Sequence, residues 1–449
     1  MVKPRRPPRK LQPSLARRIM TRSQRSSQQG CFEQLPAEVF HVILEHLTVT
    51  DLSVFSMVSK AVNACIVNHV STLSWRTRMV IQKLHHCTSP DDEHVTLAYY
   101  RSLGLLFKRC TLLLPTKDRL KFISISGCLG YACYGMFLKT LIAGWDDLEC
   151  HRVFIFLSDC TNLLRRIETI LTSRPGKLME QHIRRFCRSV LLDLNQCAGD
   201  SLFWLTHLLR PWPMVSQARL LFILCGPLCT DGKIGWQQVC DVPLAQVQLW
   251  DLAKALVLLY GNTDSREWSA GNVLSIIEEI TVLPQPWHIE NVARLLVFCG
   301  KNICYSVLAN KALNGRVLEI SQLLVLIILV CEKDCYCMKW PVMIVKQLCS
   351  LFPGASDKWS FIQSMENTFS EVSMEMYALV ASGNFLNGDG IYFTDLQISS
   401  GKVYSNAGSD VIFVCAGNQN ENEDMLQSFC RLLKASALFH TEIVYMLLK

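Results

Sequence analysis

Cysteine is the first candidate for chemistry in this sequence, because a thiolate can act as a nucleophile or bind a metal ion. The chain has 449 residues, of which 21 are cysteine and 11 are histidine. Strong zinc sites use paired Cys-x-x-Cys spacing, which is absent here, and no second cluster complements His85, His86 and Cys87. We therefore expect no metal site and interpret the cysteines as small buried hydrophobic residues. The closest groups are Cys128/Cys133, Cys225/Cys229 and Cys331/Cys335/Cys337.

Adjacent acidic residues are the second candidate, because two carboxyl groups can share acid–base work. Neighbours on a helix point about 100° apart, however, so the pairs Asp91/Asp92, Asp146/Asp147 and Glu278/Glu279 do not face one site. The sequence contains no phosphate-binding glycine loop, no Gly-x-Ser-x-Gly and no His-Glu-x-x-His. We predict a non-catalytic chain without a cofactor. A cysteine nucleophile is the alternative left open, since one sequence does not reveal a His–Cys pair.

Basic charge is concentrated in the first 25 residues, which contain nine basic side chains and no acidic one. The remaining residues carry 36 basic and 38 acidic side chains, so the body of the chain is nearly neutral. We expect residues 1–30 to be a disordered basic tail. It is either a nuclear-import signal or a solvated terminus, and a nucleic-acid contact is disfavoured because the body offers no matching basic face. The candidate import residues are Arg5, Arg6, Arg9, Lys10, Arg17 and Arg18.

Apolar segments are too short for a membrane span. The longest run, from Leu323 to Cys331, is far below the roughly 20 residues that a spanning helix needs, and it reads as a buried helix. No apolar signal segment follows the basic tail, and the number of cysteines is odd. We therefore predict reduced thiols, no membrane partner and a location in the nucleus, the cytoplasm or both.

A small helical module over residues 31–80 is the clearest structural signal. Pro36 suits the first turn of a helix, and apolar residues follow it at helical spacing. Thr50 is the expected N-cap of a second helix with Asp51 in its first turn, and a third helix covers residues 62–70. Three short helices cannot bury this much apolar surface among themselves. The surplus therefore needs a partner protein or the rest of the chain. The stripe of the first helix is Val39, Phe40, Ile43, Leu44 and Leu47.

Residues 95–382 are predicted to form an irregular α-solenoid-like helical-repeat domain. Pro211-Trp212 leads into Ala218-Arg219-Leu220-Leu221, and Pro286-Trp287 leads into Ala293-Arg294-Leu295-Leu296, at the same internal spacing. A related helix, from Ala253 to Tyr260, lies between them. Such spacing is typical of helix-pair solenoids, and the alternative is chance similarity in a Leu-rich bundle. We expect each helix to end at a left-handed glycine, namely Gly226, Gly261 and Gly300.

The module also resembles a known family, the F-box proteins. The matching residues, in order, are Leu35-Pro36-x-Glu38, Ile43-Leu44-x-x-Leu47, Asp51-Leu52, Val58-Ser59-Lys60 and Trp75-Arg76. The segments 100–110, 143–152 and 211–221 resemble one member of that family, and the likeness covers most of residues 35–380. The resemblance implies binding to the adaptor Skp1 and, through it, to a cullin–RING ubiquitin ligase. By position, the Skp1-binding residues are Leu35, Pro36, Ile43, Leu44, Leu47, Leu52 and Val58.

The same resemblance implies that the helical domain selects an unknown target protein, in a meiotic germ-cell setting. A Skp1-binding scaffold that acts without a cullin is the first alternative, and a nucleic-acid adaptor acting through the basic tail is the second. The expected organisation is an all-α chain with a linker at 81–94, a flexible insertion at 383–422 and C-terminal helices of the same domain at 423–449.

Overall fold

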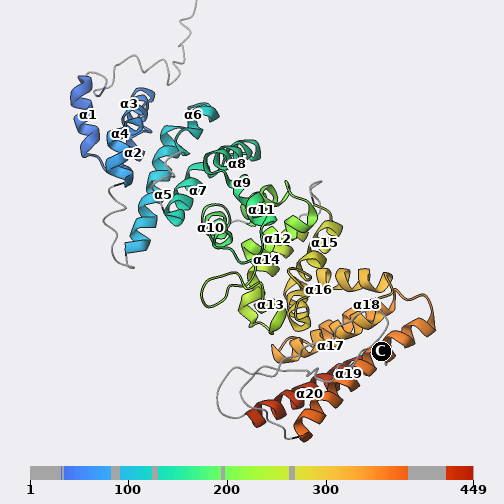
Figure 1. Cartoon of the computed structure of the whole chain (residues 1–449). Helices are drawn as coiled ribbons and strands as arrows, with labels where there is room; N and C mark the ends of the chain where they lie inside the picture. Colours follow the sequence, from blue (N-terminus) through green and yellow to red (C-terminus); the bar gives the residue numbers. More distant parts are fainter. Residues whose placement is uncertain are drawn as a thin grey trace, which may run out of the picture. The chain divides into compact units, whose positions relative to one another are not determined.

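The described part of the chain folds into helices (Figure 1). The computed structural model describes residue 32 and residues 35–81, 92–123, 130–193, 198–261, 268–382 and 421–447. Within these ranges every regular element is a helix, and the β-bridge between Leu228 and Ile234 is isolated. This confirms the all-α prediction. The expected tail at 1–30 and most of the insertion at 383–422 lie outside the described residues. Two compact units, residues 1–145 and 146–449, make up the chain.

The first unit begins with three short helices whose ends are set by polar caps. Pro36 directly precedes α1, and Ser59 caps α3 by accepting a hydrogen bond from the Val62 amide at 3.1 Å. The N-cap of α2 is Thr48, which forms a capping box with Asp51, so the prediction of Thr50 was wrong by two residues. The helices of this unit are α1 (Ala37–His46), α2 (Val49–Phe55), α3 (Lys60–Ser71), α4 (Leu73–Arg76), η2 (Thr77–Ile81), α5 (Asp92–Cys110), α6 (Thr116–Leu120) and α7 (Tyr131–Ile142).

Helix α5 belongs to the first unit because it packs on α2 and α7. Arg109 on α5 donates a hydrogen bond to Ser53 Oγ over 2.9 Å, and the Phe107 ring lies 6.1 Å from the Trp75 ring. The predicted boundary at residue 95 therefore does not separate the units. The apolar surplus of the first three helices is partly covered by α5, which sequence periodicity assigned to the following domain.

The second unit is a longer series of helices. Its central helix α17 is buried on all sides from Ile320 to Cys331, as the apolar run predicted. The helices are α8 (Asp147–Thr161), α9 (Leu163–Thr172), α10 (Leu178–Phe186), η5 (Cys187–Leu192), α11 (Ala198–Leu209), α12 (Met214–Cys225), α13 (Gln238–Asp241), η6 (Gln246–Leu249), α14 (Trp250–Tyr260), α15 (Ala270–Ile280), α16 (Ile289–Leu313), α17 (Val317–Lys333), α18 (Lys339–Cys349), α19 (Ala355–Ser382) and α20 (Glu421–Leu447).

The two Pro-Trp copies have the same local structure. Trp212 donates its indole N–H to the Leu208 carbonyl at 3.1 Å, and Trp287 donates to the Leu283 carbonyl at 2.9 Å, four residues back in each case. The arginines of the two copies both bind acceptors on other segments: Arg219 donates to the Leu171 and Ser173 carbonyls, and Arg294 donates to Asp334 as well as to Glu290 of its own helix. The internal repeat in the sequence therefore corresponds to a repeated local structure.

The glycines that close these helices differ from the prediction. Only Gly300 has a left-handed backbone, with φ of 82°, and it kinks α16 instead of ending it. Gly226 and Gly261 both have φ of −66°. Gly226 is required for space, because a Cβ atom there would lie 2.5 Å from the Phe222 carbonyl oxygen. The glycine that the repeat copies share is therefore needed for different reasons, a positive φ at Gly300 and space at Gly226.

Helix α16 is long and apolar enough, by length and composition, to cross a membrane. Its apolar character has a simpler cause, because it packs on α14, α17 and α18 and is kinked at Gly300. Arg294 is buried within it and pairs with Glu290 at 2.9 Å and Asp334 at 2.7 Å. These features are those of a core helix of a helical domain.

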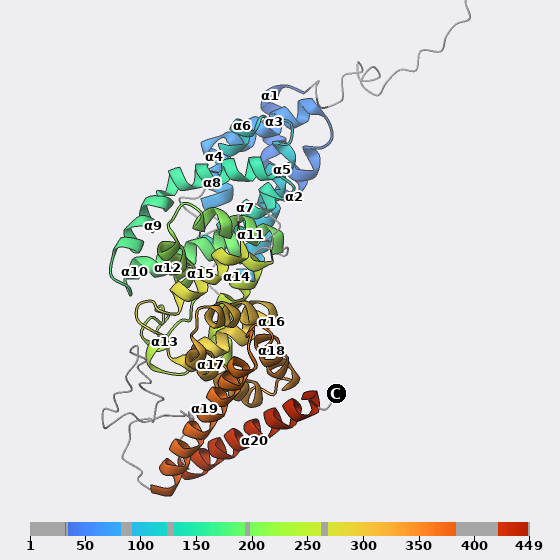
Figure 2. The same cartoon turned by 90° about the vertical axis from the view of Figure 1, so that its right-hand side faces the viewer.

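Helices α19 and α20 pack as an antiparallel pair at the end of the second unit (Figure 2). The direction follows from the ring contacts, since Phe369 lies 5.8 Å from Phe439 and Tyr377 lies 6.5 Å from Phe429. Residues 423–449 were expected to form several helices, but the described part, up to residue 447, is the single helix α20.

Candidate protein-interaction site

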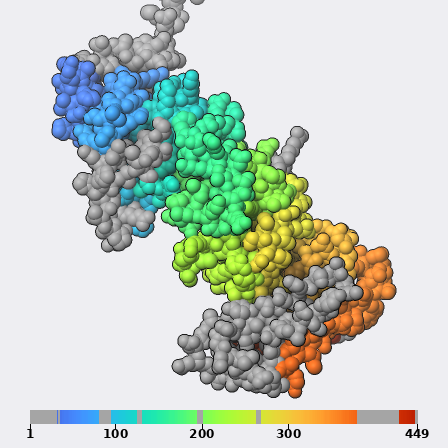
Figure 3. Space-filling model, in the orientation of Figure 1, coloured from blue at the N-terminus to red at the C-terminus, as the bar shows by residue number. Residues whose placement is uncertain are grey.

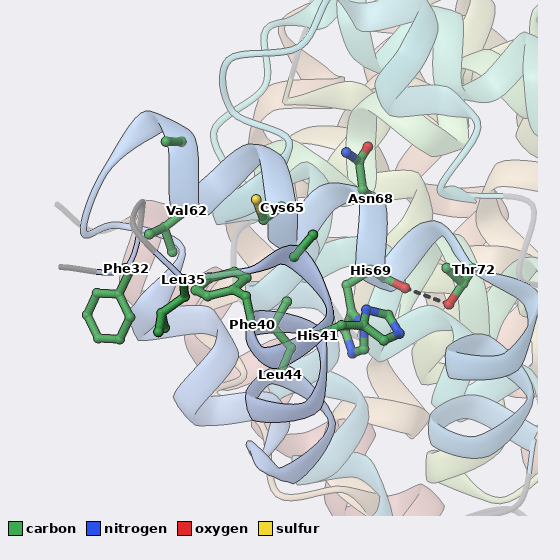
Figure 4. Close-up of a pocket in the computed structure, with 12 residues that line it drawn as sticks. Phe32, Leu35, Phe40, His41, Leu44, Val62, Cys65, Asn68, His69 and Thr72 are labelled. Atoms are coloured by element: carbon green, nitrogen blue, oxygen red, sulfur yellow. Dashed lines mark hydrogen bonds between the residues drawn. The ribbon is translucent and has the colours of Figure 1, made fainter. Parts of the chain in front are cut away.

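An apolar groove with a volume of about 460 Å³ lies between α1 and α3 (Figure 4). Phe40 and Leu44 from α1 and Val62 from α3 supply apolar surface, and Leu35 lies at the start of α1. The helices α1 and α3 make few contacts with each other, which leaves space between these side chains. The full lining is Phe32, Leu35, Ala37, Phe40, His41, Leu44, Ala61, Val62, Cys65, Asn68, His69 and Thr72.

Three phenylalanine rings pack together at one end of the groove. Phe32 lies 5.0 Å from Phe55 and 6.3 Å from Phe40, in edge-to-face geometry that suits aromatic pairs. Phe40 is buried, whereas Phe32 remains 42% exposed. The segment before α1 therefore extends the apolar surface beyond the helix.

Two histidines face each other across the groove. The Nδ1 atoms of His41 on α1 and His69 on α3 are 3.2 Å apart, so one ring must donate and the other accept. Burial lowers the pKa of His69, and the neighbouring His41 lowers it further. Glu45 lies 3.8 Å from the other ring nitrogen of His41. This arrangement keeps His69 neutral near pH 7 and links the two helices by a polar contact.

The structure places the predicted Skp1-binding residues in three different settings. Leu35, Pro36 and Val58 are exposed, and Val58 is 61% accessible. Ile43 and Leu47 are half-buried. Leu44 is buried but lines the groove.

Leu52 requires a correction. Its side chain is 0% exposed because α2 packs on α5, so it has no surface to offer to a partner. Leu52 therefore packs in the core of the first unit.

Exposed apolar residues that the sequence prediction left out also belong to this surface. Val39 and Val42 on α1 are 47% and 53% exposed, on the face opposite Phe40 and Leu44, so the prediction of a single stripe that contains Val39 was wrong. The signal was available, because these two valines are out of phase with the buried pair. Val54 and Met57, before α3, are exposed as well. We call Leu35, Val39, Val42 and the groove, which together lie on both faces of α1, the α1 surface.

Catalytic and metal chemistry find no support in the described part of the chain. No group of three or more His, Cys, Asp or Glu side chains there could hold a metal ion. Burial raises the pKa of the Cys110, Cys187 and Cys299 thiols to about 12, which makes them poor nucleophiles. The interpretation of the cysteines as buried residues was too general, since the exposed ones are Cys65, Cys160, Cys335, Cys337 and Cys430.

The predicted import residues all lie outside the described residues. Arg5, Arg6, Arg9, Lys10, Arg17 and Arg18 fall in the first 31 positions, which the structure does not describe. Nuclear import through the tail therefore stays a prediction.

Comparison with known proteins adds two family matches and two close relatives. Residues 32–74 match the F-box domain, and residues 160–385 match the family described as "FBXO47, ARM repeats". The F-box match covers α1 to α3, and the repeat match lies within the second unit from α8 to α19. The chain is 47% identical to F-box only protein 47 of Mus musculus and of Homo sapiens over 376 residues, which span 79% of this chain and 83% of each relative. No solved structure matches.

Proposed function

The chain belongs to the F-box only protein 47 family, and we propose that it is the substrate-recognition subunit of a Skp1–cullin–F-box ubiquitin ligase. In this proposal the α1 surface binds Skp1 and the second unit binds the target protein. Ubiquitin transfer belongs to the partner enzymes, and this chain contributes proximity and orientation.

The observation that carries the proposal is the uncovered apolar character of the α1 surface. Leu35 is exposed at the groove and both valines are exposed on the opposite face of α1, whereas α5 packs on α2 and α3. Burying one such side chain contributes roughly 1.5–3 kcal/mol. A partner that fills the groove and also covers the valines on the other face of α1 would therefore gain several anchors at once.

Co-purification with Skp1 tests the proposal. We expect the double change Leu35→Ala and Pro36→Ala to abolish co-purification while the thermal unfolding of the second unit stays unchanged. Val247→Ala is the matched control, because Val247 is an exposed apolar residue of the second unit, outside the proposed Skp1 surface. Equal recovery of Skp1 with the double variant and the control would defeat the assignment.

Ligase and scaffold roles differ in what they recruit beyond Skp1. A ligase subunit brings cullin into the complex and supports ubiquitin transfer to a bound protein in a reconstituted reaction. A scaffold that stabilises its partners retains Skp1 but recruits no cullin. Pull-down of purified cullin by the Skp1-bound chain separates the two, and we expect cullin to be recovered. Recovery of Skp1 without cullin would favour the scaffold role.

A further inference from the structure

One part of the second unit carries an unusual excess of positive charge. Residues 160–190 contain seven basic and two acidic side chains, although the body of the chain is nearly neutral. The segment forms α9, the turn after it and α10, and the two helices contact each other. Helices α8 to α10 lie on the face of the second unit that Figure 3 shows. The excess is therefore local and accessible.

Two of the seven basic residues are used inside the fold. The buried Arg184 donates to the Ile223 and Gly226 carbonyls at 3.0 and 2.8 Å and so caps the end of α12. Arg188 pairs with Asp193 and Asp251. These contacts give two of the seven basic residues a role inside the fold. They do not account for the other five.

The other five basic side chains are exposed and make no ion pair or side-chain hydrogen bond with any described residue. They are Arg165, Arg166, Arg174, Lys177 and Arg185, which we call the basic surface. Of the two acidic residues in the segment, Glu180 is buried and accepts hydrogen bonds from Trp236 and Gly176. Within residues 160–190, Glu168 is therefore the one exposed acidic residue beside five exposed cations. An anionic partner is therefore favoured electrostatically.

Apolar residues beside the basic surface indicate the kind of partner. Leu178 and Met179, in the first turn of α10, are 64% and 42% exposed. Protein surfaces that bind single-stranded nucleic acid typically offer aromatic rings on which bases stack, whereas the exposed apolar residues here are aliphatic. A surface that combines basic and apolar side chains suits a protein segment that combines Asp or Glu with apolar residues.

We propose that the basic surface binds an acidic, partly apolar peptide segment of the target protein. The inference rests on the proposal that the second unit selects the target. The same charges would speed encounter with such a segment, and binding would weaken as salt screens them. The surface is formed by α9, α10 and the turn between them, apart from the α1 surface in sequence and in unit.

Fluorescence anisotropy of the full chain tests the inference. The probe is a labelled peptide that repeats Glu-Glu-Leu four times, compared with the same peptide carrying Gln in place of Glu. We expect the acidic peptide to bind, the Gln peptide not to bind, and Arg165→Glu with Arg166→Glu to weaken binding by roughly tenfold or more. Lys339→Glu with Lys346→Glu is the matched control, since both lysines are exposed on α18 of the same unit.

Several outcomes would overturn the inference. They are no binding of the acidic peptide, equal affinity of the two charge-reversed variants, or tighter binding of a labelled single-stranded or duplex DNA than of the peptide. Circular dichroism confirms that each variant is folded. The failure of this inference is distinguishable from the failure of the proposed function, because Arg165→Glu with Arg166→Glu should leave Skp1 co-purification intact.

Discussion

The side-chain amide of Asn63 donates a hydrogen bond to the backbone carbonyl of Cys110 over 3.0 Å. Asn63 lies on α3, within the F-box match, and Cys110 is the last residue of α5, outside it. The last carbonyls of a helix have no partner within the helix, so this bond satisfies one of them. The F-box is thereby joined to a helix 47 residues away in sequence.

We expect Asn63→Ala to weaken the first unit. The change leaves the Cys110 carbonyl buried without this partner, which costs about 1–3 kcal/mol. Hydrogen exchange of the α5 amides measures the effect, because exchange should become faster near Cys110. Asn68→Ala is the control, since Asn68 is exposed on the same helix, and it should change stability by no more than about 0.5 kcal/mol. Identical exchange in both variants would show that the bond is not stabilising.

Arg294→Ala should destabilise the second unit strongly. Arg294 is buried and holds the carboxylates of Glu290 and Asp334 at 2.9 and 2.7 Å. Its removal leaves two poorly solvated carboxylates with only Lys333, 3.4 Å from Glu290, as a neighbouring cation. Breaking such an ion pair costs about 3–5 kcal/mol. Urea unfolding followed by circular dichroism measures this cost.

The repeat supplies a control for that measurement. Lys254 occupies the corresponding position of the related helix between the two Pro-Trp copies, but it is exposed and lies over the Trp250 ring at 5.4 Å. Lys254→Ala should change the free energy of unfolding by about 0.5 kcal/mol or less. Comparable losses at both positions would mean that burial of the ion pair is not the cause.

The first unit should lose stability as the pH falls below 6.5. The pKa of His69 is lowered from 6.5 in the folded chain by burial and by His41, so the unfolded state binds a proton first. Stability therefore rises with pH between the lowered pKa and 6.5. Glu45 raises the pKa of His69 and Arg78 lowers it. The charged and titratable groups that act on His69 therefore lie on α1 and on η2, the segment after α4.

Thermal unfolding at pH 7.5 and 5.5 checks this dependence. His69→Gln, which cannot take up the proton, should reduce the difference between the two melting temperatures. His182→Gln, an exposed histidine on α10, should leave the difference unchanged. If His69→Gln keeps the full pH dependence of the parent chain, another group is responsible.

Helix positions could be predicted well where apolar periodicity and length were strong. The run at 323–331 predicted a buried helix, and α17 has that property. The cap of α2 was misplaced because Thr48 and Thr50 are both good N-caps, and only the three-dimensional capping box with Asp51 distinguishes them. Gly226 was expected to be left-handed, but its small size is needed beside Phe222, which a sequence pattern does not reveal.

The candidate site could be predicted only in outline. A motif gives residue identities, but whether Leu52 or Val39 faces outward depends on which face α5 covers. That contact is long-range, and it was hidden because α5 follows a stretch that read as a linker. The basic surface could be predicted only in part, since the excess of basic residues at 160–190 is visible in the sequence but their exposure is not.

Affinity for purified Skp1 tests the central claim most directly. Titration of Skp1 into the intact chain, into Val39→Glu with Val42→Glu, and into Val247→Glu gives three dissociation constants under one condition. Placing two carboxylates in an apolar interface should weaken binding about a hundredfold or more. The account predicts that loss for the α1 variant and parent-like affinity for Val247→Glu. Parent-like affinity for the α1 variant would contradict it.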